Sequence, residues 1–210
     1  MDSARTQPEV GVASEAIVVV DIVESTKTNN LFGWYAVGRG IFRDLRSLID
    51  KVGAPQGLSC IKSTGDGYLV TFRNGQSAER AAVDAVDAIF ELLDLSATRN
   101  TQVSEERALN LRVAVHFGEV DVVADDREGP NVSYAFRHES ISRASLREAA
   151  DPIAPEEFPL QNYVLCSEEV ADILARRSQA RFVRSVGSFR LKGFSGWREV
   201  FQILPQAPEK

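Results

Sequence analysis

A glycine–aspartate–glycine triplet between two short apolar runs constrains the fold of this chain more than any other feature. The triplet is Gly65-Asp66-Gly67, and the runs extend from Leu58 to Lys62 and from Tyr68 to Phe72. Glycines between β-prone runs are typical of a hairpin, because a tight turn needs backbone conformations that most residues avoid. The sequence therefore predicts two antiparallel strands joined by a loop that carries Asp66.

Periodic apolar segments on either side of this hairpin complete the pattern. The β-branched run from Ala16 to Val20 predicts a buried strand, and helical spacing over about 30–51 and over 77–95 predicts two helices. The order β-α-β-β-α-β is the ferredoxin-like arrangement of an α+β fold, here with a C-terminal αβ extension. The other expected elements are strands over 109–117, 119–124, 163–166, 182–186, 189–192 and 198–203, and helices over 132–150 and 167–177.

Length and composition favour one folded domain. The chain has 210 residues, of which 44% are hydrophobic and 26% are charged, as is usual for a globular protein. We expect a flexible N-terminus over residues 1–14, the folded domain over 15–204 and a C-terminal tail over 205–210. The net charge of −6 argues against a nucleic-acid partner.

Other features bear on the compartment. No apolar run approaches the roughly 20 residues that span a bilayer, and the first residues lack the pattern of a signal peptide, so we expect no membrane insertion and a cytoplasmic protein. Cys60 and Cys166 lie in apolar runs and are expected to be buried free thiols. His116 is expected to be a structural histidine, and His138 is expected to face solvent or a dimer seam.

Two aspartates follow predicted strands at positions that can meet. Asp21 ends the first strand, and Asp66 lies in the hairpin loop. Because the first and third strands of a β-α-β-β sheet are neighbours, we expect the two carboxylates to converge at one edge. Carboxylates together with substrate phosphates are ligands that Mg²⁺ accepts. Either aspartate alone is more typical of turn chemistry, and only the pair predicts a metal site.

Five motifs, in order, resemble those of class III adenylate and guanylate cyclase catalytic domains. The resemblance covers about residues 15–203. The motifs are Val-Val-Val-Asp21-Ile22-Val-Glu-Ser25-Thr26, Lys62-Ser-Thr-Gly65-Asp66-Gly67, Leu111-Arg-Val-Ala-Val-His116-Phe-Gly118, Asp126-Arg-Glu-Gly129-Pro-Asn-Val132-Ser133-Tyr-Ala135-Phe-Arg137 and Phe189-Arg-Leu-Lys192-Gly193.

The resemblance implies an enzyme that converts a nucleoside triphosphate to a 3′,5′-cyclic nucleotide and pyrophosphate, with two divalent metal ions, Mg²⁺ or Mn²⁺. It also implies an obligate homodimer whose two active sites each take residues from both chains. The roles that it implies are metal binding by Asp21, Ile22 and Asp66, transition-state stabilisation by Arg137, ribose orientation at Ser133, triphosphate contacts by Ser25, Thr26 and Lys192, and base reading by Lys62 and Asp126.

Lys62 and Asp126 do not determine which nucleotide base is bound. Lysine only donates hydrogen bonds and aspartate only accepts them, and adenine and cytosine both present an acceptor beside a donor. Uracil presents the reverse pair, which the same side chains also satisfy.

Departures from the family pattern admit several interpretations. Ser133 stands where the family usually has asparagine, Asn131 is expected to face elsewhere, and Glu24 stands where glycine is common. We favour a pyrimidine cyclase that makes cyclic UMP or cyclic CMP, similar to the Pycsar antiphage enzymes, whose product a separate effector protein senses. An adenylate cyclase and a catalytically inactive cyclase-like binding module are the alternatives, and an unrelated palm-like fold is the last.

Overall fold

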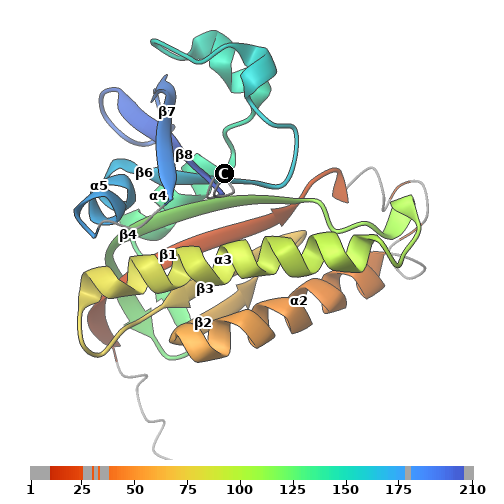
Figure 1. Ribbon diagram of the computed structural model, residues 1–210. Coiled ribbons are helices and arrows are strands. Elements are labelled where there is room, and N and C mark those ends of the chain that lie inside the picture. The colour runs from red at the N-terminus through yellow and green to blue at the C-terminus, as the bar shows by residue number, and fades with distance from the viewer. Residues whose placement is uncertain (1–9, 26–29, 31–32, 34–37, 178–180, 206–210) are drawn as a thin grey trace, which may run out of the picture.

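The computed structural model describes residues 10–25, 30, 33, 38–177 and 181–205. Its centre is an eight-stranded sheet (Figure 1). Seven of the strands follow the order β2-β3-β1-β4-β6-β8-β7, and the eighth, β5, pairs with β4. Among the described strands, only the β4–β6 pair is parallel. The strands are β1 Val10–Ile22, β2 Leu58–Ser63, β3 Gly67–Phe72, β4 Leu111–Val123, β5 Asp126–Glu128, β6 Tyr163–Ser167, β7 Phe182–Phe189 and β8 Arg198–Leu204.

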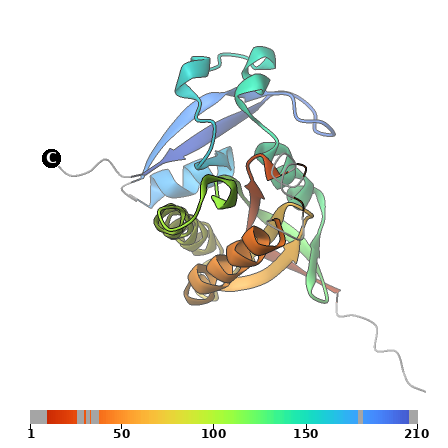
Figure 2. The same ribbon diagram turned by 90° about the vertical axis from the view of Figure 1, so that its right-hand side faces the viewer.

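Helices cover the two faces of this sheet unequally. The helices are α2 Arg39–Gly53, α3 Ala78–Asn100, α4 Pro130–Glu139 and α5 Glu168–Arg176. Helices α2 and α3 lie side by side on one face (Figures 1 and 2). Together with α5 they bury the larger apolar core. Helix α4 packs on the other face over a smaller apolar cluster.

Strand β1 alternates between these two faces. Val18 and Val20 belong to the core beneath α2 and α3, whereas Ile17 and Val19 belong to the cluster beneath α4. Successive side chains of a strand point to opposite faces, so Glu15 and Asp21 share the α4 face with Ile17. The charged residues at positions 15 and 21 thus lie at two points along one side of a central strand.

The predicted α+β, ferredoxin-like class with a C-terminal extension is confirmed, but several boundaries were wrong. Strand β1 begins at Val10, so the folded domain starts earlier than residue 15. The two strands expected over 109–117 and 119–124 form one strand, β4, because β1 pairs with it along its whole length. Gly118 lets it continue close to α4, since a Cβ there would lie 2.6 Å from the side-chain nitrogen of Asn131.

The C-terminal half also differs from expectation. The helix expected over 132–150 ends at Glu139, and the capping box of Ser142 starts a separate 3₁₀ helix over Arg143–Glu148. The strands expected over 182–186 and 189–192 form one strand, β7. A helix was expected to begin near Asn30, and most of the segment before Gly38 lies outside the described residues. Among the described residues, no helix has the length and apolar character needed to cross a membrane.

Candidate active site

Asp21 and Asp66 lie close together where β1 ends and the β2–β3 hairpin turns, as the sequence predicted. Asp21 is opposite Gly67 in the β1–β3 register. The backbone N–H of Ile22 donates to the carbonyl oxygen of Asp66 at 3.4 Å. Gly67 permits this approach, because a Cβ there would lie 2.0 Å from the carbonyl oxygen of Val20. The hairpin loop is therefore held directly against the end of β1.

An arginine from β4 lies between Asp21 and a third carboxylate. Arg112 is opposite Asp21 in the β1–β4 register and donates to Asp21 Oδ2 at 2.8 Å. Its Nε donates to Glu139, at the end of α4. Burial raises the pKa of Asp21 to about 7, with the nearby charges of Glu139 and Asp66 adding to the effect, although Arg112 opposes it. Negative charge is therefore concentrated here beyond what one arginine neutralises.

This donor set fits a divalent cation. Asp21 lies at the end of β1 and Asp66 lies in the neighbouring β2–β3 loop, and the repulsion between their carboxylates is the condition that a bound cation relieves. Across the described residues, no three histidine, cysteine, aspartate or glutamate side chains gather as a ready-made metal site. Further ligands would have to be backbone oxygens, such as the carbonyl of Ile22, and oxygens of the substrate.

The turn after β1 points a hydroxyl at this site. Ser25 donates from Oγ to Asp66 Oδ2 at 3.1 Å. Glu24 has a φ of 58°, the left-handed conformation that glycine adopts without strain, so the backbone keeps the shape that glycine would favour here. Thr26 lies outside the described residues.

The two expected base-reading residues form an ion pair. Lys62 projects from β2 and Asp126 from β5, and the Lys62 ammonium donates to Asp126 Oδ2. The side chain of Lys62 is 52% exposed and that of Asp126 is 31% exposed. This hydrogen bond raises the pKa of Lys62 and lowers that of Asp126. A donor and an acceptor therefore stand side by side at the surface.

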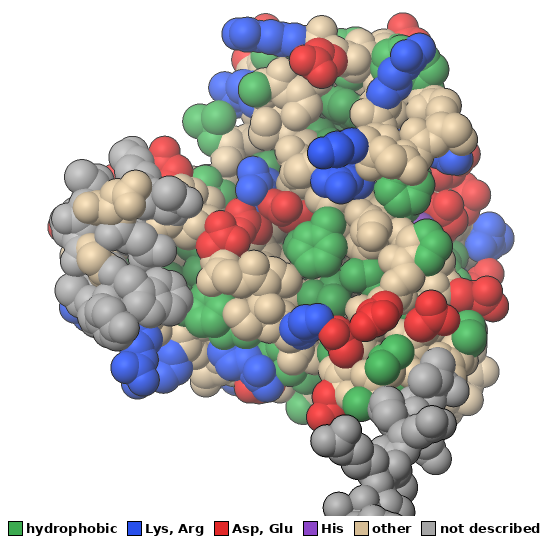
Figure 3. Space-filling view, turned by 180° about the vertical axis from the view of Figure 1, so that it is seen from behind, with side chains coloured by type: hydrophobic (Ala, Val, Ile, Leu, Met, Phe, Trp, Pro, Cys, Tyr) green, Lys and Arg blue, Asp and Glu red, His purple; other side chains and the backbone are tan. Residues whose placement is uncertain are grey.

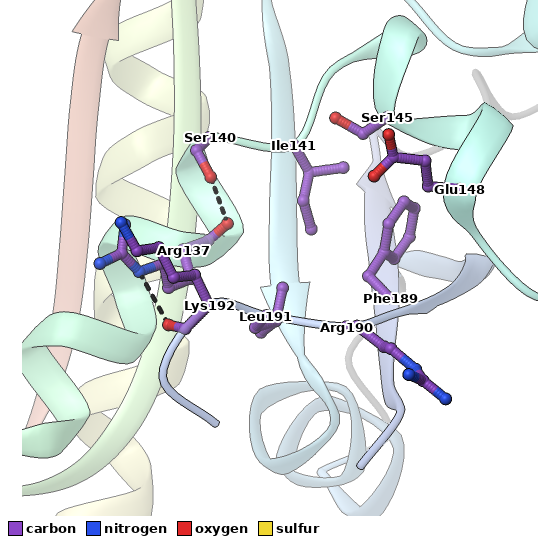
Figure 4. Close-up of a pocket in the computed structure, with 9 residues that line it drawn as sticks. All are labelled: Arg137, Ser140, Ile141, Ser145, Glu148, Phe189, Arg190, Leu191 and Lys192. Atoms are coloured by element: carbon purple, nitrogen blue, oxygen red, sulfur yellow. Dashed lines mark hydrogen bonds between the residues drawn. The ribbon is translucent and has the colours of Figure 1, made fainter. Parts of the chain in front are cut away.

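Arg137 and Lys192 lie together in a different place. Arg137 donates from Nε to the carbonyl oxygen of Lys192 at 3.2 Å. Both line a pocket of about 370 Å³, with Arg190 at its other end (Figure 4). Glu139, two positions further along α4, turns toward Arg112, and two helical residues are about 200° apart around the axis. Arg137 is thus directed away from the Asp21 of its own chain.

Asn131 and Ser133 of α4 differ in their surroundings. Asn131 donates to the carbonyl oxygen of Glu119 at 2.8 Å and contacts His116 Nε2 at 3.0 Å. It faces β4, as expected from its position, and cannot replace the usual asparagine. Ser133 is exposed.

A sequence model of the adenylate and guanylate cyclase catalytic domain matches residues 12–150. The chain belongs to this family. The matched segment contains the Asp21–Asp66 edge, the Lys62–Asp126 pair and Arg137.

The individual proteins that resemble this chain share either a short segment or a low sequence identity with it. "Putative adenylate cyclase 3" of Rhizobium meliloti (strain 1021) is 37% identical over 91 residues, which are 43% of this chain and 14% of that protein. The adenylyl cyclase CyaB of P. aeruginosa has a TM-score of 0.73 at 17% identity, over 95% of this chain and 98% of the other. A rhodopsin-guanylyl cyclase core in complex with ATPαS has a TM-score of 0.74 at 16% identity, over 95% and 100%. At these identities the structural likeness shows the shared fold.

The sequence interpretation of this cyclase domain missed Arg112 and Glu139 as members of the site. Arg112 stands near the start of an otherwise apolar strand, and a half-buried arginine in such a strand needs a carboxylate partner. That signal was present in the Leu111-Arg-Val motif. Glu139 carried no comparable signal, because a glutamate at a helix end is ordinarily solvated.

Two histidines, His116 of β4 and His138 of α4, are buried where that strand and that helix pack together. His116 is buried, and its ring nitrogens contact Ser167 Oγ at 2.8 Å and Asn131, which confirms the structural role expected for it. The expectation for His138 was wrong. Its side chain is fully buried, edge-on to the ring of Tyr134, because the helix turns it inward against β4.

His138 carries a testable pH dependence. Burial lowers its pKa to about 4, while the unfolded chain keeps an ordinary pKa near 6.5. The folded state favours the neutral ring. The contribution of His138 to the free energy of unfolding is therefore fully present above pH 6.5 and is lost as the pH falls toward 4. Between pH 7 and pH 4 the free energy of unfolding of the wild type should fall by roughly 3 kcal/mol more than that of His138→Asn.

Asparagine is the matched replacement, because its Nδ2 can donate to the Tyr134 carbonyl, which His138 Nδ1 contacts at 3.0 Å. Denaturant unfolding of both proteins across this pH range measures the difference. Parallel stability curves for the two proteins would contradict the assignment.

Proposed function

We propose that this protein is a nucleotide cyclase that converts a nucleoside triphosphate to a 3′,5′-cyclic nucleotide and pyrophosphate. The observation that carries the proposal is the convergence of Asp21 and Asp66 at one sheet edge beside Arg112. Two divalent cations, Mg²⁺ or Mn²⁺, bound there would promote loss of the ribose 3′-hydroxyl proton and neutralise the departing pyrophosphate. The residues Asp21, Asp66 and the carbonyl of Ile22 would hold them.

The chain's own cations and hydroxyls would position the triphosphate. Ser25 is held at the site by Asp66, and with Thr26 it would donate hydrogen bonds to phosphate oxygens. Once cations share the charge of Asp21, Arg112 would release that carboxylate and donate to the triphosphate. Its hydrogen bond to Glu139 would keep the arginine at the site. Arg137 would stabilise the charge at phosphorus, Lys192 would contact the terminal phosphates, and Ser133 would orient the ribose.

A second copy of the chain is needed to complete this site. Within one protomer, Arg137 is directed toward Lys192 and not toward Asp21, and Lys62 binds Asp126. The sheet face opposite α2 and α3 shows hydrophobic side chains among acidic and basic ones (Figure 3). A homodimer formed through this face would place the arginine and the base readers of one chain against the carboxylates of the other.

We place a pyrimidine first among the bases. Phe136 of α4 packs on the cluster that contains Val19 and Leu69, and Leu69 is the register partner of Lys62. We infer from this placement that Phe136 narrows the space for the base, which would favour a single ring over a purine. Cyclic UMP or cyclic CMP would then be the product, made in the cytoplasm during antiphage defence and sensed by a separate effector. An adenylate cyclase is the second candidate, favoured by the similarity to the protein named "Putative adenylate cyclase 3".

An assay with Mn²⁺ and each of ATP, GTP, CTP and UTP tests the base. We expect CTP or UTP to be cyclised fastest, and Phe136→Ala to raise the rate with ATP relative to the pyrimidines, because it enlarges the space beside Lys62. Product identification by mass spectrometry measures both. Predominant cyclic AMP from the wild type would favour the second candidate, and no product from any nucleotide would favour an inactive binding module.

Mixing two inactive variants tests the composite dimer. Asp66→Ala and Arg137→Ala should each abolish turnover. If subunits exchange freely, half of the dimers in an equal mixture are mixed, and each has one intact site of two, so about a quarter of wild-type activity should return. Size-exclusion chromatography checks that both variants remain dimers. A mixture of two folded dimeric variants that exchange subunits yet stay inactive would contradict a site shared between chains.

A further inference from the structure

We propose that Arg127, anchored on the buried carboxylate of Glu15, positions Lys62 and Asp126 and thereby sets the base selectivity of the enzyme. The inference rests on the proposed function, because it assigns a support to the base readers of that site. Neither Glu15 nor Arg127 touches the base in this account. Both act through the Lys62–Asp126 pair.

Glu15 is a charged residue in the interior. Its side chain is fully buried on the α4 face of β1, and Arg127 of β5 is 6% exposed. Arg127 donates from Nε to Glu15 Oε2 at 2.7 Å and from Nη2 to Oε1 at 3.2 Å. Burial alone would raise the pKa of Glu15, but the hydrogen bonds and charges of its partners outweigh burial and lower it. The pair is therefore ionised and tied in a two-pronged geometry.

The same guanidinium connects three strands. Besides Glu15 of β1, it donates from Nη2 to the carbonyl oxygen of Ser59 on β2 at 3.4 Å. Its Nη1 donates to the carbonyl oxygen of Asp126 on β5 at 2.9 Å. Arginine suits this task, because its donors are fixed in one plane and cannot move independently. Shifting β5 against β2 would break at least one of these bonds.

The base readers depend on that arrangement. Strand β5 pairs with β4, yet it reaches across the sheet to β2, which lies on the far side of β1 and β3. Lys62 and Asp126 stand on β2 and β5, and a second link joins Cys60 to the carbonyl oxygen of Asp125 at 3.2 Å. Because Arg127 bridges β2 and β5 next to these residues, it fixes the separation between the donor and the acceptor.

A second arginine provides a matched control. Arg73 also donates to Glu15 Oε1, from Nε at 3.1 Å and Nη2 at 2.8 Å. In the described part of the chain, its side-chain hydrogen bonds go to Glu15 alone. Both arginines thus neutralise the same carboxylate, but only Arg127 also holds β2 and β5. A change that merely weakens the buried ion cluster should affect both positions alike, whereas a positioning role belongs to Arg127.

The experiment compares Arg127→Lys with Arg73→Lys in the full-length protein. Lysine keeps the charge beside Glu15 but lacks the planar fork. Binding of the four 3′-deoxynucleoside triphosphates, which lack the attacking hydroxyl, is measured with Mn²⁺ by calorimetry. We expect Arg127→Lys to weaken binding of the preferred nucleotide about tenfold and to bring the four affinities within about threefold of one another, whereas Arg73→Lys keeps the wild-type preference. Hydrogen exchange over residues 119–128 should quicken in Arg127→Lys only.

Equal effects of the two substitutions on selectivity, or an unchanged preference in Arg127→Lys, would overturn the inference, as would a wild type that binds all four nucleotides equally. If Arg127→Lys does not fold, the double variant Glu15→Gln with Arg127→Gln removes both buried charges and must show the same loss of preference. A wild type that binds selectively but forms no cyclic product would refute the proposed cyclase activity, while the comparison of Arg127→Lys with Arg73→Lys would still decide whether Arg127 sets the selectivity of nucleotide binding.

Discussion

The pairing of β1 with a strand on each side is the constraint on which the rest of the structure depends. On one side the register sets Asp21 opposite Gly67, and on the other it sets Asp21 opposite Arg112. A slip of one residue in either pair would turn these side chains to the other face. The valines beneath α2 and α3 oppose such a slip, because it would move them out of the core. The apolar packing of β1 therefore fixes the geometry of its charges.

The two buried carboxylates of β1, Asp21 and Glu15, have different roles in the site. Asp21, at the end of the strand, shares an excess of negative charge with Asp66 and Glu139, and this suits divalent cations, which would in turn hold a triphosphate. Glu15, further back on the same face, is fully neutralised by arginines and acts as an anchor. An unpaired carboxylate in either place would be strongly destabilising. Strand β1 thus carries one carboxylate that can bind ligands, Asp21, and one that stabilises the structure, Glu15.

Much of this could be predicted from local sequence, and the exceptions share a cause. The Gly65-Asp66-Gly67 hairpin and the apolar run before Asp21 suffice to predict that the two aspartates meet, because strand neighbours follow from the order of elements. The inward turn of His138 and the arrival of Arg127 beside Glu15 depend on how α4 and β5 cross the sheet. Such contacts join residues that are far apart in the chain, so the periodicity of apolar residues along the sequence cannot predict them. The roles carried by family resemblance, such as those of Lys192 and Ser133, remain predictions.

The central claim is that Asp21 and Asp66 hold divalent cations against a triphosphate. Counting bound Mn²⁺ by electron paramagnetic resonance, with a 3′-deoxynucleoside triphosphate present, tests it most directly. We expect about two ions per active site in the wild type, and fewer in Asp21→Asn and in Asp66→Asn, which keep the shape of the side chain but lose its charge. A folded Asp66→Asn protein that binds as many ions as the wild type, with the same affinity, would contradict the account.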